Sequence, residues 1–414
     1  MSTNYLAKIY QLDENELIQL DRKCHAAIKR KSLSVSSILR HCIRQIQRQM
    51  QKTNRIFLCK SILVLNPKLK DNFNKDILRY EKILRRFEEV QPASFSDVSI
   101  GCQDILLHTR ALIKFIFLYW RCTKAQKDLL KRTYKDYFSA SMMSHFLEKM
   151  EPSTVIFYGG SYYIMYFFMA IIIRRNGAKR VLYLNSPLLD NDDIMNVDEV
   201  VLYHRWQRDN AKNMICAKKY TIGGCESIHL VPPYRRSDRK KRDSMAIYSS
   251  GVHARHKLDF DVEERLREYR LSEELMRKLM ERYARLYPNL CFSIFLHPGI
   301  EDFDGAQQFY GRLLYLPNVR ISDDGRSQDS FDDYELGISN ISATLFERIE
   351  GGHKSCFVFP SGFCDIFRKT ALSSIVVENY DNAIERIENM RLMPRSEYFK
   401  SIGFSEVPCL QKDV

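Results

Sequence analysis

The chain has 414 residues, of which 45% are hydrophobic and 12% aromatic, and it carries a formal net charge of +13. This composition excludes a disordered chain, and the length exceeds what one hydrophobic core usually supports, so we expect two domains. The longest apolar run, residues 162–173, is too short for a transmembrane helix, which needs about 20 residues. It is expected to be a buried helix.

The first residues lack the basic end and apolar run of a secretory signal. The 11 cysteines include no Cys-x-x-Cys pair and lie in apolar surroundings, which is typical of reduced core thiols. We therefore expect a cytoplasmic protein, either free or attached at the inner face of the plasma membrane.

The positive charge is concentrated in one part of the sequence. Residues 1–243 contain 43 Lys and Arg against 24 Asp and Glu, a net charge of +19, whereas residues 244–414 contain 21 against 27, a net charge of −6. The first part is therefore expected to meet an anionic partner, which could be an acidic glycan, phospholipid headgroups or nucleic acid.

The first 150 residues have a largely helical pattern. Apolar residues recur at helical spacing in 34–52, with Arg40, Arg44 and Arg48 on another face, and a second helix is expected within 104–125. The first of these helices has either a solvated basic side or a face for a membrane surface or an acidic polymer.

From residue 154 the pattern changes to strands that alternate with helices, which predicts a parallel sheet. Strands are expected in this part at 154–158, 180–184, 199–203 and 228–231. The charged segment 232–242 is the expected linker. Beyond it the alternation restarts, with strands expected at 245–248, 292–296, 318–321, 334–338, 355–359 and 374–377 and a charged helix at 271–286.

Three features of the second part converge on one edge of its expected sheet. His297 and Pro298 follow an apolar strand, Ser250 and Gly251 follow another, and the segment from Ser342 to Thr344 begins a helix. The first turn of a helix has unpaired N–H groups and the positive end of a dipole, and open α/β sheets bind ligands beyond the carboxyl ends of their strands. The pattern predicts a phosphate site, although Ser342 and Thr344 could equally be a helix cap.

Two successive Rossmann-like halves, with His297-Pro298 and Ser342-Ala-Thr344 in the second, resemble the GT-B glycosyltransferases. The resemblance is closest to bacterial enzymes of capsule and lipopolysaccharide biosynthesis, such as sialyltransferases and Kdo transferases. It implies an α/β fold of two Rossmann-like domains facing across a cleft, with a helical N-terminal extension. It also implies a metal-independent, cofactor-independent transferase whose second domain holds a nucleotide sugar, with a CMP-linked acidic sugar as one option. By the same resemblance, Glu347 contacts the ribose, with Glu350 as a second candidate.

This resemblance divides the chain into four parts: a helical, basic N-terminal part of the acceptor domain (1–150), a Rossmann-like acceptor domain (151–240), a Rossmann-like donor domain (244–385) and a C-terminal helix or tail (386–414). The expected partners are a nucleotide-sugar donor and a glycan or lipid-linked acceptor. An anionic membrane surface is a further option, and nucleic acid is not expected.

An inverting transferase needs a base in the acceptor domain. Asp190, Asp192 and Asp193 follow one strand, and His204 ends another. Asp190 and His204 are the candidates retained. The sequence Asp323-Asp324-Gly325 matches an acidic pair of sialyltransferases in composition, but it lies in the second domain and a turn explains it equally well.

Two other classes stay open. Sugar-nucleotide epimerases or hydrolases share the two-domain shape, and a non-enzymatic protein could bind a polyanion through its basic half. The sequence contains no Gly-x-Gly-x-x-Gly, Walker or zinc-type motif and no nucleic-acid-binding signature, so no metal ligands are predicted.

Overall fold

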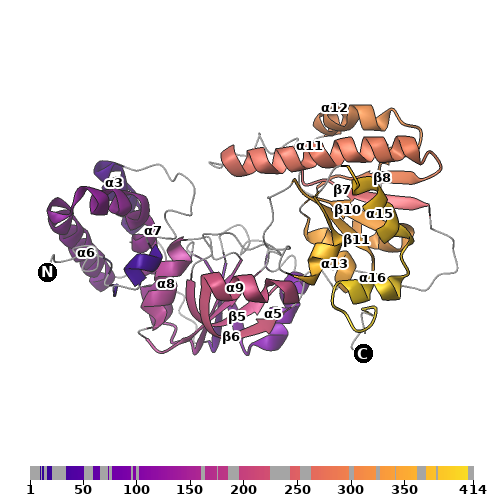
Figure 1. Cartoon of the computed structure of the whole chain (residues 1–414). Coiled ribbons are helices and arrows are strands. Elements are labelled where there is room, and N and C mark those ends of the chain that lie inside the picture. Colours follow the sequence, from indigo (N-terminus) through magenta and orange to yellow (C-terminus); the bar gives the residue numbers. More distant parts are fainter. Residues whose placement is uncertain are drawn as a thin grey trace. The chain divides into compact units, whose positions relative to one another are not determined.

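The computed structural model describes residues 10, 12–13, 16–20, 34–50, 59–65, 73, 77–94, 97–98, 102–159, 164–174, 176–184, 195–223, 243–251, 263–297, 303–322, 327–340, 342–360, 370–378 and 381–408. The chain forms two compact units, Met1–Gly224 and Cys225–Val414 (Figure 1). Each unit contains one six-stranded sheet in which neighbouring strands run parallel. The predicted pair of Rossmann-like α/β domains is therefore confirmed. The predicted linker at 232–242 and the strand at 228–231 lie outside the described residues.

The first sheet has the strand order β2-β1-β3-β4-β5-β6. Its strands are β1 (Ser61–Val64), β2 (Val90–Ala93), β3 (Thr154–Tyr158), β4 (Lys179–Tyr183), β5 (Met195–Leu202) and β6 (Ile215–Ile222). The helices of this unit are α3 (Val35–Met50), α5 (Glu81–Arg86), α6 (Cys102–Arg121), α7 (Lys124–Glu148), α8 (Ile164–Arg174) and α9 (Arg208–Met214), with short 3₁₀ helices η1 (Ile77–Tyr80) and η3 (Arg205–Gln207).

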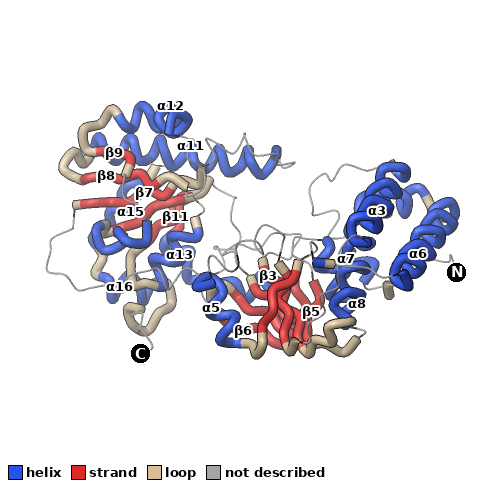
Figure 2. The backbone as a smooth tube through the Cα atoms, turned by 180° about the vertical axis from the view of Figure 1, so that it is seen from behind, coloured by secondary structure: helices blue, strands red, loops and turns tan. Residues whose placement is uncertain are grey.

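Alternation along the strands gives the first sheet two apolar faces. Leu63, Ile156 and Val181 share one face and pack in one cluster with Tyr80 and Ile83, which come from η1 and α5. Helix α8 contacts β4 and β5 and lies on the other side of the sheet (Figure 2). The predicted apolar helix is thus the buried cover of a sheet, and no helix in the described parts of the chain is long and apolar enough to cross a membrane.

The segment up to residue 150, predicted to be largely helical, also contributes two short strands to the first sheet. Strands β1 and β2 come from this segment, and β1 lies between β2 and β3 in the sheet. Helices α3, α6 and α7 make up the helical part, in which the ring of Phe115 stacks on that of Tyr134 with centroids 3.8 Å apart. The N-terminal residues therefore supply two strands of the first sheet in addition to the helical part.

The second sheet has the order β12-β11-β10-β7-β8-β9. Its strands are β7 (Ser244–Tyr248), β8 (Cys291–Phe295), β9 (Val319–Ile321), β10 (Leu336–Ser339), β11 (Ser355–Val358) and β12 (Val376–Val377). The helices of this unit are α11 (Glu263–Leu286), α12 (Phe303–Leu314), α13 (Ala343–Glu350), α15 (Ala383–Leu392) and α16 (Arg395–Ser401), with 3₁₀ helices η5 (Ser327–Asp333) and η6 (Ala371–Ile375). Helices α11 and α12 lie on one side of the sheet and α13 on the other (Figure 1).

The C-terminal helices are fastened to the second unit by buried polar contacts. Lys354, 1% exposed, forms an ion pair with Glu335 at 2.6 Å and donates to the carbonyl oxygen of Met393, which follows α15. In α16, the Tyr398 hydroxyl donates to the carbonyl oxygen of Ser355 and accepts from its N–H. Helices α15 and α16 therefore stabilise the sheet that holds the candidate site.

Candidate functional site

The strand orders define where each sheet can bind a ligand. Counted from its own first strand, the second sheet has the order 3-2-1-4-5-6 of dinucleotide-binding folds, and the first has the order 2-1-3-4-5 with one strand added. In such sheets there are two neighbouring strands whose following connections run to opposite sides of the sheet. Ligands bind in the crevice that this leaves beyond the carboxyl ends of those two strands. The two strands are β7 and β10 in the second sheet and β1 and β3 in the first.

The loop after β7 is held by a buried glutamate on α11. Glu273 is fully buried, and its carboxyl group accepts bonds from the Ser249 hydroxyl at 2.6 Å, from the N–H and hydroxyl of Ser250 and from the Tyr310 hydroxyl. Burial, and next the neighbouring Glu273, raise the pKa of Tyr310 well above its usual range. The loop conformation is thus fixed from inside the unit.

Gly251 completes this loop with φ of +70°, a conformation that favours glycine. Its N–H donates to the Ser249 hydroxyl oxygen at 3.1 Å. The hydroxyls of Ser249 and Ser250 both donate to Glu273. If Ser250 and Gly251 bind a phosphate, as predicted, they would do so through the backbone N–H groups of this fixed loop.

The other side of the crevice is formed by the end of β10 and the start of α13. The Ser339 hydroxyl donates to the carbonyl oxygen of Tyr248 at 2.7 Å, which joins β10 to β7, and Asn340 is fully buried beside it. The Ser342 hydroxyl accepts from the Thr344 N–H at 3.2 Å. Ser342 is thus the cap of α13, as the sequence allowed, and this cap brings the positive end of the helix to the crevice.

His297 and Glu347 lie close to these elements in the fold. His297 is half-buried beyond β8, the strand that pairs directly with β7. Glu347 is 4% exposed on α13, where its carboxylate accepts from Gln328 of η5 at 2.8 Å. Their contacts with phosphate and ribose stay predictions, as does that of Pro298, which lies outside the described residues.

Beneath the crevice lies a buried arginine that the sequence did not single out. Arg348 of α13 is fully buried, and its guanidinium donates to the carbonyl oxygens of Phe331, Tyr334 and Lys354 and to the Tyr248 hydroxyl. Gly337 of β10 makes room for it, because a Cβ there would lie 2.5 Å from Arg348 Nε. Arg348 therefore ties α13 and η5 to the two strands at the crevice.

The catalytic candidates of the first unit are only partly described. Asp190, with Asp192 and Asp193, lies outside the described residues, as does the segment from Asp323 to Gly325. His204 follows β5, two strands away from β3, and is 2% exposed with its ring 5.4 Å from that of Trp206. A base must come within hydrogen-bond reach of its substrate, so a catalytic role for His204 requires access that this conformation does not offer, and the role stays a prediction.

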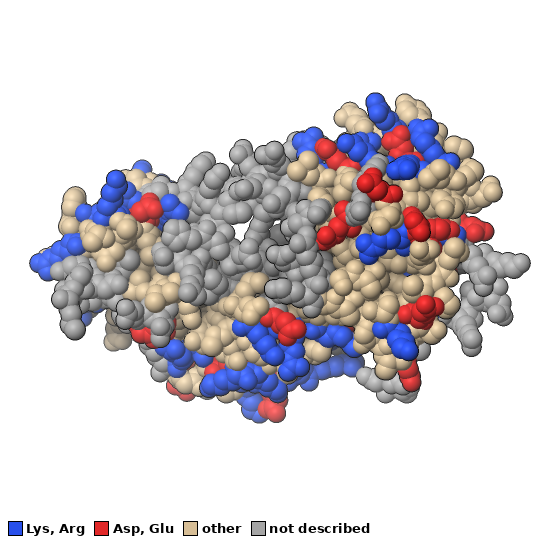
Figure 3. Space-filling model, viewed as in Figure 1, with Lys and Arg blue, Asp and Glu red and all other residues tan. Residues whose placement is uncertain are grey.

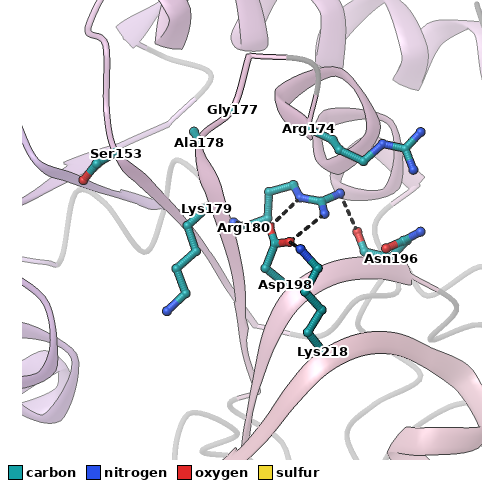
Figure 4. A pocket seen from close by; sticks show the side chains of 9 residues that line it. All are labelled: Ser153, Arg174, Gly177, Ala178, Lys179, Arg180, Asn196, Asp198 and Lys218. Carbon is teal, nitrogen blue, oxygen red and sulfur yellow. Dashed lines mark hydrogen bonds and ion pairs between the residues drawn. The ribbon is translucent and has the colours of Figure 1, made fainter.

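A basic cavity of about 680 Å³ lies at the opposite, amino-terminal edge of the first sheet (Figure 4). It is lined by Ser153, Arg174, Gly177, Ala178, Lys179, Arg180, Asn196, Asp198 and Lys218. Arg180 Nε bonds Asp198 at 2.9 Å, and Lys179 Nζ bonds the buried Glu199 at 2.7 Å. These cations are paired with carboxylates, which favours a structural role for the cavity wall.

Two carboxylates bonded to the cations of this wall, Asp198 in the wall and Glu199 behind it, have lowered pKa values. Burial raises the pKa of Glu199, but bonds from Lys179, Thr221 and Arg86 outweigh it and lower the pKa from 4.5 to about 2. At Asp198 burial also raises the pKa, but the bonds from Arg180 and Lys218 outweigh it and lower the pKa from 3.8 to about 2. Because the unfolded chain binds more protons between these values, both groups stabilise the fold above about pH 4.5 and lose this contribution as the pH falls toward 2.

We expect Glu199→Gln to lower the free energy of unfolding at pH 7 by about 1–3 kcal/mol, the range for hydrogen bonds to charged groups. The same variant should flatten the rise of stability with pH between 2 and 4.5, measured by urea unfolding. Asp128→Asn, which breaks an exposed pair with Arg132, is the control and should cost under about 1 kcal/mol. An unchanged pH profile in Glu199→Gln would contradict the assignment.

Within the described residues, no group of three or more His, Cys, Asp or Glu side chains could hold a metal ion. Of the described cysteines, Cys42, Cys59, Cys122 and Cys356 are buried free thiols, whereas Cys216 and Cys291 are exposed. Burial raises the pKa of Cys42 and of Cys356 to about 12, so neither is a reactive thiolate.

The class defined by this geometry is an α/β protein with two doubly wound parallel sheets. No protein-family model matches the sequence, and no curated protein is significantly similar to it. Solved structures are similar in fold, with TM-scores of 0.45. One is a UDP complex of Staphylococcus aureus MnaA, which is 11% identical in sequence; the match covers 85% of this chain and 92% of MnaA. Another is the UDP-GlcNAc 2-epimerase of Neisseria meningitidis, which is 12% identical; the match covers 84% of this chain and 95% of the epimerase.

MurG of Acinetobacter baumannii is also 12% identical, with 83% of this chain and 93% of MurG covered at the same TM-score. The similar structures thus include an epimerase. Likeness at this level does not define an activity, because one fold supports many functions.

Proposed function

We propose that this protein is a glycosyltransferase that moves a sugar from a nucleotide donor to a surface-glycan or lipid-linked acceptor. The observation that carries the proposal is the point between β7 and β10 where the strand order reverses, because the glycine-containing loop fixed by Glu273 follows β7 and the capped start of α13 follows β10. Backbone N–H groups and a helix start at such a point suit the phosphates of a nucleotide.

The donor half of the reaction requires stabilisation of a leaving phosphate. Gly251, the first turn of α13 and His297 would supply N–H donors there, so the proposal needs no metal ion and no further cofactor. Ser250, Ser342 and Thr344 would act by holding the backbone, and Glu347 with Pro298 would shape the nucleoside side. A CMP-linked acidic sugar is one option for the donor, based on the resemblance of the His297-Pro298 sequence.

The acceptor half is assigned to the first unit. Residues 1–224, which make up this unit, contain 37 Lys and Arg against 21 Asp and Glu, a net charge of +16. This excess suits an acidic glycan or a lipid-linked saccharide at the inner face of the plasma membrane. Figure 3 shows basic side chains gathered along the lower edge of this unit and over its helical part. Asp190 and His204 remain the proposed bases, because in the sequence Asp190 comes after β4 and His204 comes shortly after β5.

A second candidate is a sugar-nucleotide epimerase or hydrolase, which the same crevice would serve equally well. The charge of the first unit argues against it, since a small-molecule enzyme has no need of a basic domain. A polyanion-binding protein without enzymatic activity is the third candidate. It does not explain the fixed loop and the helix start between β7 and β10.

Turnover of labelled nucleotide sugars separates these candidates. We expect one of CMP-, UDP- and GDP-linked sugars to be consumed only when an acidic oligosaccharide or a lipid-linked saccharide extract is present. His297→Ala should weaken binding of that nucleotide about tenfold or more, corresponding to one hydrogen bond to a charged group. Cys291→Ala, at the exposed amino end of the same strand, should not change it.

Turnover without an acceptor would favour the epimerase or hydrolase. The absence of both turnover and calorimetric binding for every nucleotide would contradict the proposal. Equal affinity in wild type and His297→Ala would remove only His297 from the site.

A further inference from the structure

Helix α6 exposes a stripe of large apolar side chains. Leu106 is 53% exposed, Ile113 62%, Phe117 57% and Trp120 74%, with Ile116 beside them at 39%. At 3.6 residues per turn these five positions fall within an arc of about 100° on the 20-residue helix. A stripe of this width on one helix marks an interaction surface rather than scattered surface residues.

The opposite side of α6 is already occupied by its own bundle. Leu112, Phe115 and Leu118 are buried there, and Asp104 is bound by His145 at 2.8 Å and by Lys149. The exposed stripe is therefore a second apolar face and is not needed to pack α6 against α7.

Basic residues border the stripe along one side. Arg110, Lys114 and Arg121 occupy the next 60° or so of the helix, and the Arg121 guanidinium lies 4.3 Å from the centre of the Phe117 ring. The single acidic residue of α6 is the buried Asp104, and α3, which contacts α6, contains no acidic residue but exposes Arg40, Arg44 and Arg48. Figure 1 shows α6 on the side of this helical part that lies away from α8, and Figure 3, in the same view, shows Lys and Arg side chains at that end of the unit.

We infer that α6 docks this protein on an anionic lipid surface, with the stripe in the headgroup boundary and the flanking Arg and Lys on lipid phosphates. Large aliphatic side chains, an exposed tryptophan and a basic border on one helix are the features of helices that lie in a membrane interface. A second copy of the chain fits less well, because neither α6 nor α3 exposes a carboxylate to meet the basic border. This inference concerns where the protein is held and does not depend on the proposed reaction.

Co-sedimentation of the full chain with vesicles tests the inference. The wild type should bind vesicles of phosphatidylcholine with 30% phosphatidylglycerol at least tenfold more tightly than phosphatidylcholine alone, and 1 M salt should abolish this preference. The triple variant Ile113→Ser, Phe117→Ser and Trp120→Ser should lose at least tenfold. Arg110→Gln, Lys114→Gln and Arg121→Gln together should remove the preference for anionic lipid.

The matched control is Leu286→Ser, Tyr315→Ser and Leu392→Ser, three exposed apolar residues of the second unit, and it should bind as the wild type does. Failure of the wild type to bind anionic vesicles at low salt, as expected if another segment of the chain covers the stripe, would overturn the inference. So would equal binding by the stripe variant, or a self-association in sedimentation equilibrium that the stripe variant abolishes. Turnover in solution is read separately, so either proposal can fail without the other.

Discussion

Replacing Glu273 by alanine is expected to lower the free energy of unfolding by about 3 kcal/mol or more and to weaken nucleotide binding at least tenfold. The substitution leaves the buried hydroxyls of Ser249, Ser250 and Tyr310 without their acceptor, and each such donor costs about 1–3 kcal/mol. The loop after β7 would then lose its fixed conformation. Urea unfolding and calorimetry with nucleotide measure the two effects.

Two further variants sharpen this test. Glu273→Gln keeps the shape and one acceptor oxygen, so it should fall between wild type and alanine in both measurements. Glu274→Ala, next on the same helix but partly exposed and paired with Arg270 at 3.4 Å, should change neither by more than about 1 kcal/mol. If Glu273→Ala unfolds the protein more easily but binds nucleotide as well as wild type, the loop is not part of the site.

Gly337→Ala is expected to destabilise the second unit by about 2–4 kcal/mol. The added Cβ would lie 2.5 Å from Nε and 2.6 Å from Cδ of Arg348 and 2.9 Å from the Tyr248 ring. Overpacking costs about 1–3 kcal/mol, and displacement of Arg348 would also strain its bonds to three carbonyl oxygens. Chemical unfolding measures the sum.

The cause can be separated from a general cost of alanine in the sheet. In the double variant Gly337→Ala with Arg348→Ala, the clash with the Arg348 side chain is absent. Its loss of unfolding free energy should therefore be smaller than the sum of the losses in the two single variants. Gly311→Ala in α12, where a Cβ meets nothing within 4 Å, should be neutral or stabilise by up to about 1 kcal/mol. Strict additivity would contradict the proposed packing of Arg348.

The sequence predicted the second sheet well, because its strands are short apolar runs separated by clear helices. The predicted run at 245–248 is β7, and that at 292–296 corresponds to β8. These buried parallel strands need no alternating pattern, and the short apolar runs Met245-Ala-Ile-Tyr248 and Phe292-Ser-Ile-Phe295 identify them.

Three strands of the first sheet were missed for different physical reasons. β1 is a four-residue apolar run next to helical patterns, and β2 contains Pro92, which is tolerated at the edge that β2 forms. β6 is the strand at the other edge of the sheet. Most of its side chains are at least partly exposed, and Lys218 and Lys219 give it a charged sequence that does not resemble a strand. Edge strands carry little apolar burial, so their sequences resemble loops.

Within the site, sequence reasoning found the strand ends but not what holds them. Ser250, Gly251 and Ser342 were recognised because they follow strands or begin a helix. Glu273 lies in a highly charged helix, where nothing local distinguishes it from the partly exposed Glu274. Arg348 was hidden in the same way, since only the tertiary fold buries it against β7 and β10.

The central claim is that nucleotide binds at the crevice between β7 and β10. Amide hydrogen exchange of the full chain with saturating CMP and, separately, UDP tests it most directly. We predict slower exchange in peptides that contain Ser249–Gly251 and Ser339–Thr344 for the nucleotide that binds. Protection confined to other segments, such as those lining the basic cavity of the first unit, or no protection with either nucleotide, would contradict the claim.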